Sequence, residues 1–389
     1  MMLPLCVAVL AFSFVPALAF TCQDDSCLST LKIIRKYGYP AEAHNVTTAD
    51  GYILTMHRIP CTNTTKPKKV VFLQHCILCS SAVFVINGPK KSLAFVLADK
   101  GYDVWMGNAR GNIYSKRHTA LSTTDPRYWA FSWHEMGVYD LPAEFNYIFA
   151  VTGRPKLYYI GHSMGTTMMY VLLSVRPEYN SRINLFISLS PVAYMSHIRS
   201  TVFRILYGPL AHALMKMGFN DFVPQNELIT KLNRNLCQLH SSFGAICSNV
   251  LFLIAGYDSE QLNQTLLPVI FGHLPAGTST ASLVHYGQSM QTGDFRMFDY
   301  GPEGNKRIYK TNIPPRYDIE KITAPSAFFT GANDLLAVPT DVTKLVNRMP
   351  NLVMVYKVPF PAFNHMDFLF ASDVMNLLYE KVLKILQQY

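Results

Sequence analysis

The feature that most constrains this 389-residue chain is the alternation of short apolar runs with segments of helical spacing. Between the earlier runs, Ser92–Lys100 and Tyr139–Val151 have the spacing of helices. Strands that alternate with helices pair in parallel through right-handed crossovers. The sequence therefore predicts an α/β fold with a mostly parallel central sheet, preceded by a hairpin that turns at Asp50-Gly51. The expected parallel strands are 70–74, 103–106, 157–160, 185–189, 326–330 and 353–358.

The alternation stops between about residues 193 and 319, where the chain is rich in Met, Phe, Leu and Tyr and has few strand-like runs. We interpret this stretch as a mostly helical cap inserted between two strands. Residues 20–192 and 320–389 then form the two parts of the core. Within the cap, Thr201–Phe219 is apolar around most of a helix and is interrupted by Gly208-Pro209. Such a helix favours burial in the core over contact with lipid.

Residues 1–19 have the pattern of a signal peptide, because an apolar run ends in Ala17-Leu18-Ala19. The run is short for a bilayer span, so we expect cleavage rather than an uncleaved anchor. No later stretch approaches ~20 uninterrupted apolar residues, so no transmembrane anchor is expected. The chain is therefore expected to be secreted or lysosomal.

Cysteines and sequons agree with a secretory route. Of the eight cysteines, Cys6 lies in the expected signal peptide, and the remaining odd number leaves at least one thiol free or paired between chains. Cys237 and Cys247 lie close together in the cap region, and we predict a disulfide between them. Cys22 and Cys27 are the other candidate pair. The sequons at Asn45, Asn63 and Asn263 predict N-glycans.

Several other chemistries are disfavoured. The formal net charge is +9, but Lys and Arg are dispersed, whereas a nucleic-acid-binding protein gathers them on one element. The chain contains neither a G-x-x-x-x-G-K-[ST] phosphate loop nor an H-E-x-x-H motif. Cys76-x-x-Cys79 lacks a second pair at zinc spacing. We therefore expect no nucleic-acid partner, no metal and no organic cofactor.

The pentapeptide Gly161-His-Ser163-Met-Gly165 stands between the apolar run 157–160 and the helix-like segment 166–175. A G-x-S-x-G sequence in a strand–turn–helix context is the nucleophile-elbow pattern, so Ser163 is the candidate nucleophile. A serine hydroxyl is a weak nucleophile. It needs a base, and the base needs an acid that orients it.

The candidates for these two roles follow the last two expected strands. On this fold the chain order is serine, acid, histidine, which favours Asp334 and His365. Both follow the carboxyl end of a strand, the usual active-site edge of such a sheet. Asp341 and Asp367 are rival acids, although Asp367 is only two residues past His365 and is less suited to reach its imidazole. We expect His162 to pack inside the elbow rather than to act as the base.

Acyl transfer also needs donors for the oxyanion that forms on the acyl carbonyl. One should be the backbone N–H of Met164, the residue after the nucleophile. The second should come from the loop after the first parallel strand, within residues 75–78.

Several sequence blocks of this chain are similar to those of a known family. The chain resembles the acid lipases, the group of lysosomal acid lipase, gastric lipase and their insect relatives, from about Tyr37 to the C-terminus. The blocks that carry the resemblance are Tyr37–His44, Thr48–Leu54, Asp103–Asn112, Gly161–Thr166, Pro275–Ser279 and Asn364–Phe368.

The resemblance implies an α/β-hydrolase core with a cap, and hydrolysis of triacylglycerols or cholesteryl esters at a lipid–water interface. It also implies a triad of Ser163, Asp334 and His365, with oxyanion donors at the Ile77 and Met164 backbones. The alternative function is a non-catalytic lipid carrier on the same scaffold, which loss of a triad residue would favour. A peptidase is a more distant alternative.

Two positions depart from the family pattern. Cys76 stands where the family usually has glycine, and Met164 stands where it usually has glutamine. A main-chain donor survives a side-chain change, so Met164 is expected to be tolerated. Cys76 is expected to impair the enzyme only modestly, with Cys76→Gly raising turnover by less than about tenfold.

Overall fold

The structure is a computed structural model that describes residues 24–61, 69–223 and 244–389. The expected signal peptide, Cys22, Asn63 and Cys237 lie outside the described residues.

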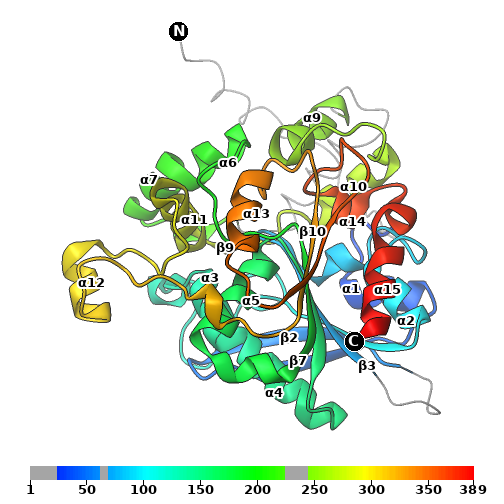
Figure 1. The fold of residues 1–389 in the computed structure, drawn as a ribbon, viewed down its shortest axis with the longest axis horizontal. Coiled ribbons are helices and arrows are strands. Elements are labelled where there is room, and N and C mark those ends of the chain that lie inside the picture. The colour runs from blue at the N-terminus through cyan, green and yellow to red at the C-terminus, as the bar shows by residue number, and fades with distance from the viewer. Residues whose placement is uncertain (1–23, 62–68, 224–243) are drawn as a thin grey trace, which may run out of the picture.

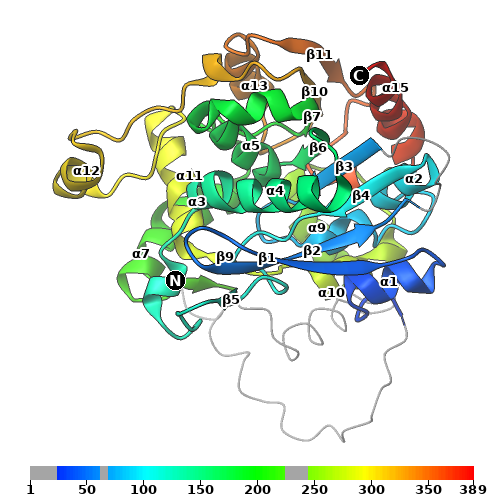
Figure 2. The same cartoon turned by 90° about the horizontal axis from the view of Figure 1, so that it is seen from below.

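A sheet of nine strands forms the centre of the described chain. Its order is β1-β2-β4-β3-β6-β7-β10-β11, with β5 paired to β2, and Figure 2 shows it running from β1 at one edge to β11 at the other. β2 pairs antiparallel with β1, β4 and β5, whereas all the pairs from β4 to β11 are parallel. The bounds are β1 Glu42–Thr47, β2 Tyr52–Ile59, β3 Lys69–Gln74, β4 Tyr102–Met106, β5 Arg117–His118, β6 Leu157–His162, β7 Ile183–Leu189, β10 Ser326–Thr330 and β11 Leu352–Lys357.

The mostly parallel sheet expected from the sequence is confirmed, and β10 has the expected bounds. The hairpin is also present: β1 and β2 flank a turn in which Gly51 has a φ of 96°. Glycine adopts this left-handed φ without a steric penalty, which explains the residue choice.

Helices cover both faces of the sheet because successive strand side chains point to opposite sides. Phe72 of β3 packs into a core with helices α4 and α5, whereas its neighbours Val71 and Leu73 pack into a second core with α2 and α15. The elements outside the sheet and outside the long insertion described next are α1 Thr30–Lys36, η1 Ser81–Phe84, α2 Leu93–Asp99, η2 Pro126–Trp129, α3 Trp133–Glu135, η3 Met136–Asp140, α4 Leu141–Thr152, α5 Met164–Val175, η4 Pro177–Arg182, η7 Ile319–Lys321, α13 Pro339–Val346, α14 Asp367–Phe370, η8 Met375–Tyr379 and α15 Glu380–Gln388.

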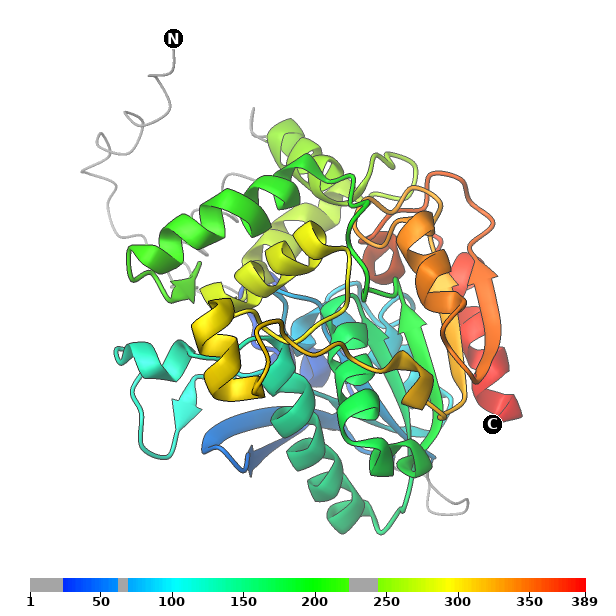
Figure 3. The same cartoon turned by 60° about the vertical axis from the view of Figure 1, so that its left-hand side comes forward.

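A mostly helical segment, residues 201–309 and here called the β7–β10 insertion, lies between β7 and β10 in the chain. Its helices gather over one end of the sheet, and α12 projects away from the rest (Figures 1 and 3). Among the described residues, it contains α6 Thr201–Ile205, η5 Leu206–Leu210, α7 Ala211–Lys216, β8 Asp221–Phe222, α9 Gly244–Ala255, η6 Gln264–Leu266, α10 Leu267–His273, β9 Thr278–Ser279, α11 Thr280–Thr292 and α12 Gly301–Tyr309.

The apolar stretch Thr201–Phe219 differs from the expectation that it lies in the core. Gly208 breaks the helical geometry next to Pro209, as the sequence indicated. Around that break some side chains are buried, but Ile205, Met217 and Phe219 are all more than half exposed. Exposed apolar side chains of this kind occur where a protein surface contacts a partner or a lipid surface instead of water. No helix in the described ranges combines the length and apolar character needed to cross a bilayer.

Candidate active site

The candidate nucleophile lies on a sharp turn between β6 and α5. Ser163 has a φ of 53° and a ψ of −116°, and α5 begins at the next residue. The flanking glycines permit this geometry. A Cβ on Gly165 would overlap the Gln74 carbonyl oxygen, and one on Gly161 would meet the backbone of Gly165. Strained backbone of this kind is typical of a nucleophile elbow, in which the serine side chain stands above the sheet.

The candidate acid and base come from the two loops that follow β10 and β11. The Nδ1 atom of His365 lies 3.0 Å from each carboxylate oxygen of Asp334. Both side chains are buried. When Nδ1–H donates to Asp334, the Nε2 atom of the same ring keeps its lone pair and can accept a proton.

Asp334 remains an acceptor because its surroundings favour the ionised form. Burial raises the pKa of its carboxyl group, but the positive charge and hydrogen bond of His365, with further hydrogen bonds, bring the pKa below its ordinary value. The backbone N–H groups of Leu336 and Ala337 each donate to Oδ1 at 2.9 Å. The main chain thus fixes one oxygen of the Asp334 carboxylate, while both of its oxygens face His365.

The two rival acids bind elsewhere. Asp341 accepts from the backbone N–H of His197 at 2.9 Å and contacts its Nδ1 at 2.7 Å. Asp367 accepts from the backbone N–H of Asn364 at 2.6 Å, and so braces the loop that carries His365 without reaching the imidazole. Of these carboxylates, Asp334 is the one that contacts His365.

A further polar residue, Ser190, contacts both Asp334 and His365 and was not predicted from the sequence. Ser190 directly follows β7, is fully buried and has a φ of 56°. Its hydroxyl donates to Oδ2 of Asp334 at 2.6 Å and lies 2.7 Å from Nδ1 of His365. Because its O–H points to the carboxylate, its lone pair is available to the Nδ1–H. The signal in the sequence was its place at the carboxyl end of a parallel strand, the same edge as the other candidates.

His162 packs inside the elbow. Its Nε2–H donates to the backbone carbonyl of His365 at 2.9 Å, and the two rings lie 5.0 Å apart. Burial, with the nearby charge of His365, lowers the pKa of His162 to about 3. A neutral, buried imidazole of this kind ties the elbow to the histidine loop.

The two candidate oxyanion donors lie at the start of α5 and in the turn after β3. Met164 is the first residue of α5, and first-turn amides have no acceptor inside their helix. Ile77 lies in the turn after β3, where Cys79 N–H donates to Cys76 O at 3.2 Å. Within the described ranges, the Ile77 amide donates to no protein group. Both amides are therefore available to a ligand.

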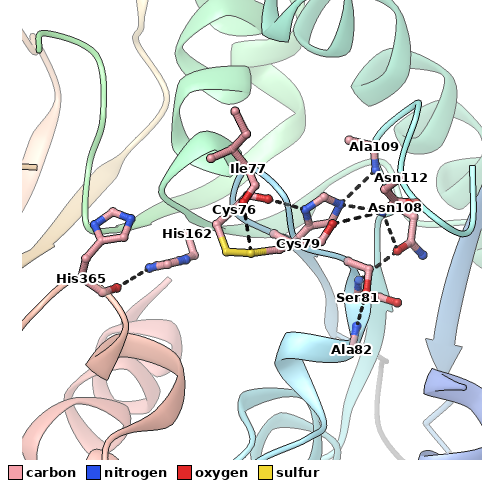
Figure 4. The surroundings of a disulfide bond; sticks show 12 residues. Cys76, Ile77, Cys79, Ser81, Ala82, Asn108, Ala109, Asn112, His162 and His365 are labelled. Atoms are coloured by element: carbon pink, nitrogen blue, oxygen red, sulfur yellow. Dashed lines mark hydrogen bonds between the residues drawn. A yellow bond between two sulfur atoms is a disulfide. The ribbon is translucent and has the colours of Figure 1, made fainter. Parts of the chain in front are cut away.

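The structure contains one disulfide that was not predicted from the sequence. Cys76 and Cys79, considered above only as half of a zinc motif, form a disulfide across this turn (Figure 4). Cys76 is also not among the described non-glycine residues with positive φ, so its Cβ causes no backbone strain. Cys247 is disulfide-bonded as well, while its expected partner Cys237 lies outside the described residues. A disulfide between neighbours in sequence depends on the turn that separates them, which spacing alone does not show.

Two of the three sequons can be located. Asn45 is exposed on β1, where its Oδ1 accepts from Thr55 and Arg117. Asn263 is partly exposed and caps η6 through its Oδ1. In both cases the side-chain nitrogen, to which a glycan is attached, is not the atom making these contacts.

Comparison with known proteins supports the same class of site. Residues 69–372 match the family described as alpha/beta hydrolase fold, and residues 30–88 match a partial alpha/beta-hydrolase lipase region. Lipase 1 of Drosophila melanogaster is 41% identical over 366 residues, covering 94% of this chain and 81% of the relative.

Two human relatives cover the chain equally well. Gastric triacylglycerol lipase is 38% identical, and lysosomal acid lipase/cholesteryl ester hydrolase is 37% identical, each match covering 94% of this chain and 92% of the relative. Among solved structures, a candidate lipase from Sulfolobus solfataricus superposes with a TM-score of 0.58 at 15% identity, covering 86% of this chain and 90% of that one. At that identity the superposition establishes the fold alone.

Proposed function

The chain belongs to the α/β-hydrolase lipases, and from this premise we propose that it hydrolyses fatty-acyl esters of neutral lipids through an acyl-enzyme at Ser163. The substrate class is taken from relatives named for triacylglycerol and cholesteryl ester hydrolysis. The observation that carries the proposal is the buried contact between Asp334 and His365, on loops beside the strained elbow of Ser163.

The chemistry follows from the roles these atoms can take. Nε2 of His365 accepts the Ser163 hydroxyl proton as Oγ bonds to the acyl carbon. The carbonyl oxygen becomes an oxyanion, and the amides of Ile77 and Met164 donate to it. His365 then gives the proton to the alcohol as the ester C–O bond breaks. Water repeats the sequence, which releases the fatty acid and frees Ser163. Asp334 keeps the imidazole oriented and stabilises its protonated form throughout.

Contact with a lipid–water interface is part of the proposal. Exposed apolar side chains recur on the helices of the β7–β10 insertion and on the residues just after them: Ile205, Leu210, Met217, Phe219, Leu253 and Tyr257. Residues of α6 and α9 pack on each other, so Ile205 and Leu253 belong to neighbouring helices. Exposed apolar clusters of this kind mark sites that meet a partner or a lipid surface. In this proposal, residues 193–319 form a cap domain that carries the contact.

We also propose that the protein is secreted or lysosomal. The Cys76–Cys79 disulfide and the bonded state of Cys27 and Cys247 agree with an oxidising compartment. N-glycans at Asn45, Asn63 and Asn263 belong to the same proposal. Sequencing the N-terminus of the secreted protein, and its mobility before and after a glycosidase, test the signal peptide and the glycans.

The proposed function is tested with Ser163→Ala, assayed on a short-chain p-nitrophenyl ester, emulsified triacylglycerol and cholesteryl ester. The matched control is Ser174→Ala, which changes a buried serine of α5 whose hydroxyl donates to Val171 O in its own helix. The wild type and the control should hydrolyse ester and react with a serine-directed phosphonate, whereas Ser163→Ala should do neither. A folded wild type that binds lipid but is no more active than Ser163→Ala would instead support the lipid-carrier alternative.

A further inference from the structure

The Cys76–Cys79 disulfide closes the turn that carries one of the proposed oxyanion donors. The Cα atoms of the two cysteines lie 5.2 Å apart, and Cys79 N–H donates to Cys76 O. These are the features of a β-turn with Ile77 and Leu78 at its centre. The ring closed by the S–S bond contains the backbone dihedrals on both sides of the Cys76–Ile77 peptide. The bond therefore restrains the direction of the Ile77 N–H.

The turn has a residue that glycine would suit better. Leu78 has a φ of 60°, in the left-handed region, where a residue with a side chain is strained. A turn without a cross-link can relieve this strain by rotating its central dihedrals. The disulfide joins the two corners of the turn and opposes that relaxation.

Hydrogen bonds act together with the disulfide, because they hold the carbonyl groups of Cys76 and Leu78 on either side of the central Ile77–Leu78 peptide. Ala109 N–H donates to Nε2 of His75 at 3.1 Å, so the ring proton lies on Nδ1, which donates to Cys76 O at 2.7 Å. Burial lowers the pKa of His75 to about 4, so the ring stays neutral and keeps this pattern at neutral pH. On the far side, the Ala276 N–H of the β7–β10 insertion donates to Leu78 O at 2.6 Å.

We infer that the Cys76–Cys79 disulfide is a positioning element of this chain's oxyanion hole, which aims the Ile77 amide at the acyl oxygen and makes turnover depend on the intact S–S bond. The inference rests on the proposed function, since it needs Ile77 as an oxyanion donor. It also reverses the expected effect of the glycine substitution. Cys76→Gly removes the cross-link, so it should lower turnover rather than raise it.

The test compares Cys76→Ser, Cys79→Ser and the double variant on a soluble short-chain ester. Each variant lacks the same bond, so all three should lose kcat by a similar factor, and the double variant should lose no more than the single ones. We expect a loss of about 10–100-fold, below the ~10²–10³-fold that complete removal of a donor causes. KM should change little. Cys27→Ser, which removes a disulfide elsewhere, is the matched control and should keep wild-type kcat.

A transition-state analogue separates positioning from general stability. A trifluoromethyl ketone adds to the serine and places an oxyanion in the hole, so its Ki should rise by the factor by which kcat/KM falls. Reduction offers a route without substitution. Two electrons and two protons from dithiothreitol convert the disulfide to two thiols as the reagent closes to its cyclic disulfide. Because Cys76 and Cys79 are only 4% and 3% exposed, loss of activity should be slow, and reoxidation should restore it.

The outcomes are distinguishable. Equal losses of kcat in the three variants, with a parallel rise in Ki and a normal Cys27→Ser, support the inference. Wild-type kcat and Ki in all three variants, even with a lowered melting temperature, would reduce the disulfide to a structural cross-link and overturn it. A wild type no more active than Ser163→Ala would show that the proposed function itself is wrong.

Discussion

Replacing Ser190 with alanine should slow ester hydrolysis without abolishing it. The substitution removes a hydroxyl that lies 2.6 Å from Asp334 and 2.7 Å from His365, and it leaves the Cβ and the backbone conformation in place. A hydrogen bond to a charged group contributes about 1.5–3 kcal/mol. Only the part of this energy that orients or stabilises the imidazolium of His365 affects the activation barrier for ester hydrolysis.

The remaining contacts limit the size of the effect. Without the hydroxyl, Asp334 still accepts from Leu336 N and Ala337 N and still lies 3.0 Å from His365. We therefore assign about 1.4 kcal/mol to the barrier, which is a tenfold fall in kcat. Asp334→Asn, which puts the histidine in the wrong tautomer, should instead cost about 10⁴-fold.

The pH profile gives a second readout. The Ser190 hydroxyl is one of the groups that lower the pKa of Asp334. Its removal should raise that pKa, so Asp334 becomes protonated at a higher pH and activity falls earlier on the acid side. A loss of packing alone would lower kcat without this shift.

The assay is kcat and KM on a soluble ester across pH, with melting temperatures for each variant. Ser188→Ala is the matched control, since it removes a buried hydroxyl of β7, the strand that Ser190 follows, and that hydroxyl lies 2.7 Å from the Tyr170 hydroxyl. Wild-type kcat in Ser190→Ala, or an equal loss in Ser188→Ala, would refute the reasoning.

Three further predictions follow from the described contacts. Burial, followed by repulsion from Asp258, raises the pKa of Asp367 well above its ordinary value. As pH rises from about 4, the folded state keeps a proton that the unfolded state has lost, so the free energy of unfolding falls. The melting temperature of Asp367→Asn should therefore fall less than that of the wild type over this range, and a pH-independent difference between the two would contradict this. Gly165→Ala should destabilise by about 1–3 kcal/mol in chemical denaturation, because its Cβ would overlap the Gln74 carbonyl; unchanged stability would show that the elbow has room. Met217→Ser with Leu253→Ser should lower activity on emulsified triacylglycerol while sparing a soluble ester, because both side chains are about 60% exposed; equal losses on both substrates would argue against an interfacial role.

The sheet could be predicted because apolar, β-branched runs and turn residues are local signals. Ser163, Asp334 and His365 could be proposed in the same way, since each follows a strand at one edge of the sheet, and the structure brings Asp334 and His365 into contact. The sequence could not show the role of Ser190, because a serine after a strand becomes distinctive only when β7 and β10 pair and bring it to Asp334. The Cys76–Cys79 disulfide could not be predicted either, since it depends on a turn that brings the two Cα atoms to 5.2 Å.

The predicted disulfide between Cys237 and Cys247 stays a prediction that peptide mapping without reduction can test, with a free thiol at Cys237 as the contrary result. Cys247 itself is disulfide-bonded and lies on α9, and the far end of that helix contacts the loops that carry Asp334 and His365. Ala255 O accepts from the backbone N–H of Leu335 at 3.2 Å and from that of His365 at 3.4 Å.

The next two carbonyls after α9 continue the pattern. Gly256 O accepts from the Asn364 side chain at 2.9 Å, and Tyr257 O accepts from the Asn333 side chain at 2.7 Å. Asn333 and Asn364 directly precede the candidate acid and base in the chain. A shift of the C-terminal end of α9 would therefore move both loops together. Because buried backbone groups are costly to leave unpaired, the β7–β10 insertion is part of the frame that sets the distance between Asp334 and His365, in addition to covering the sheet.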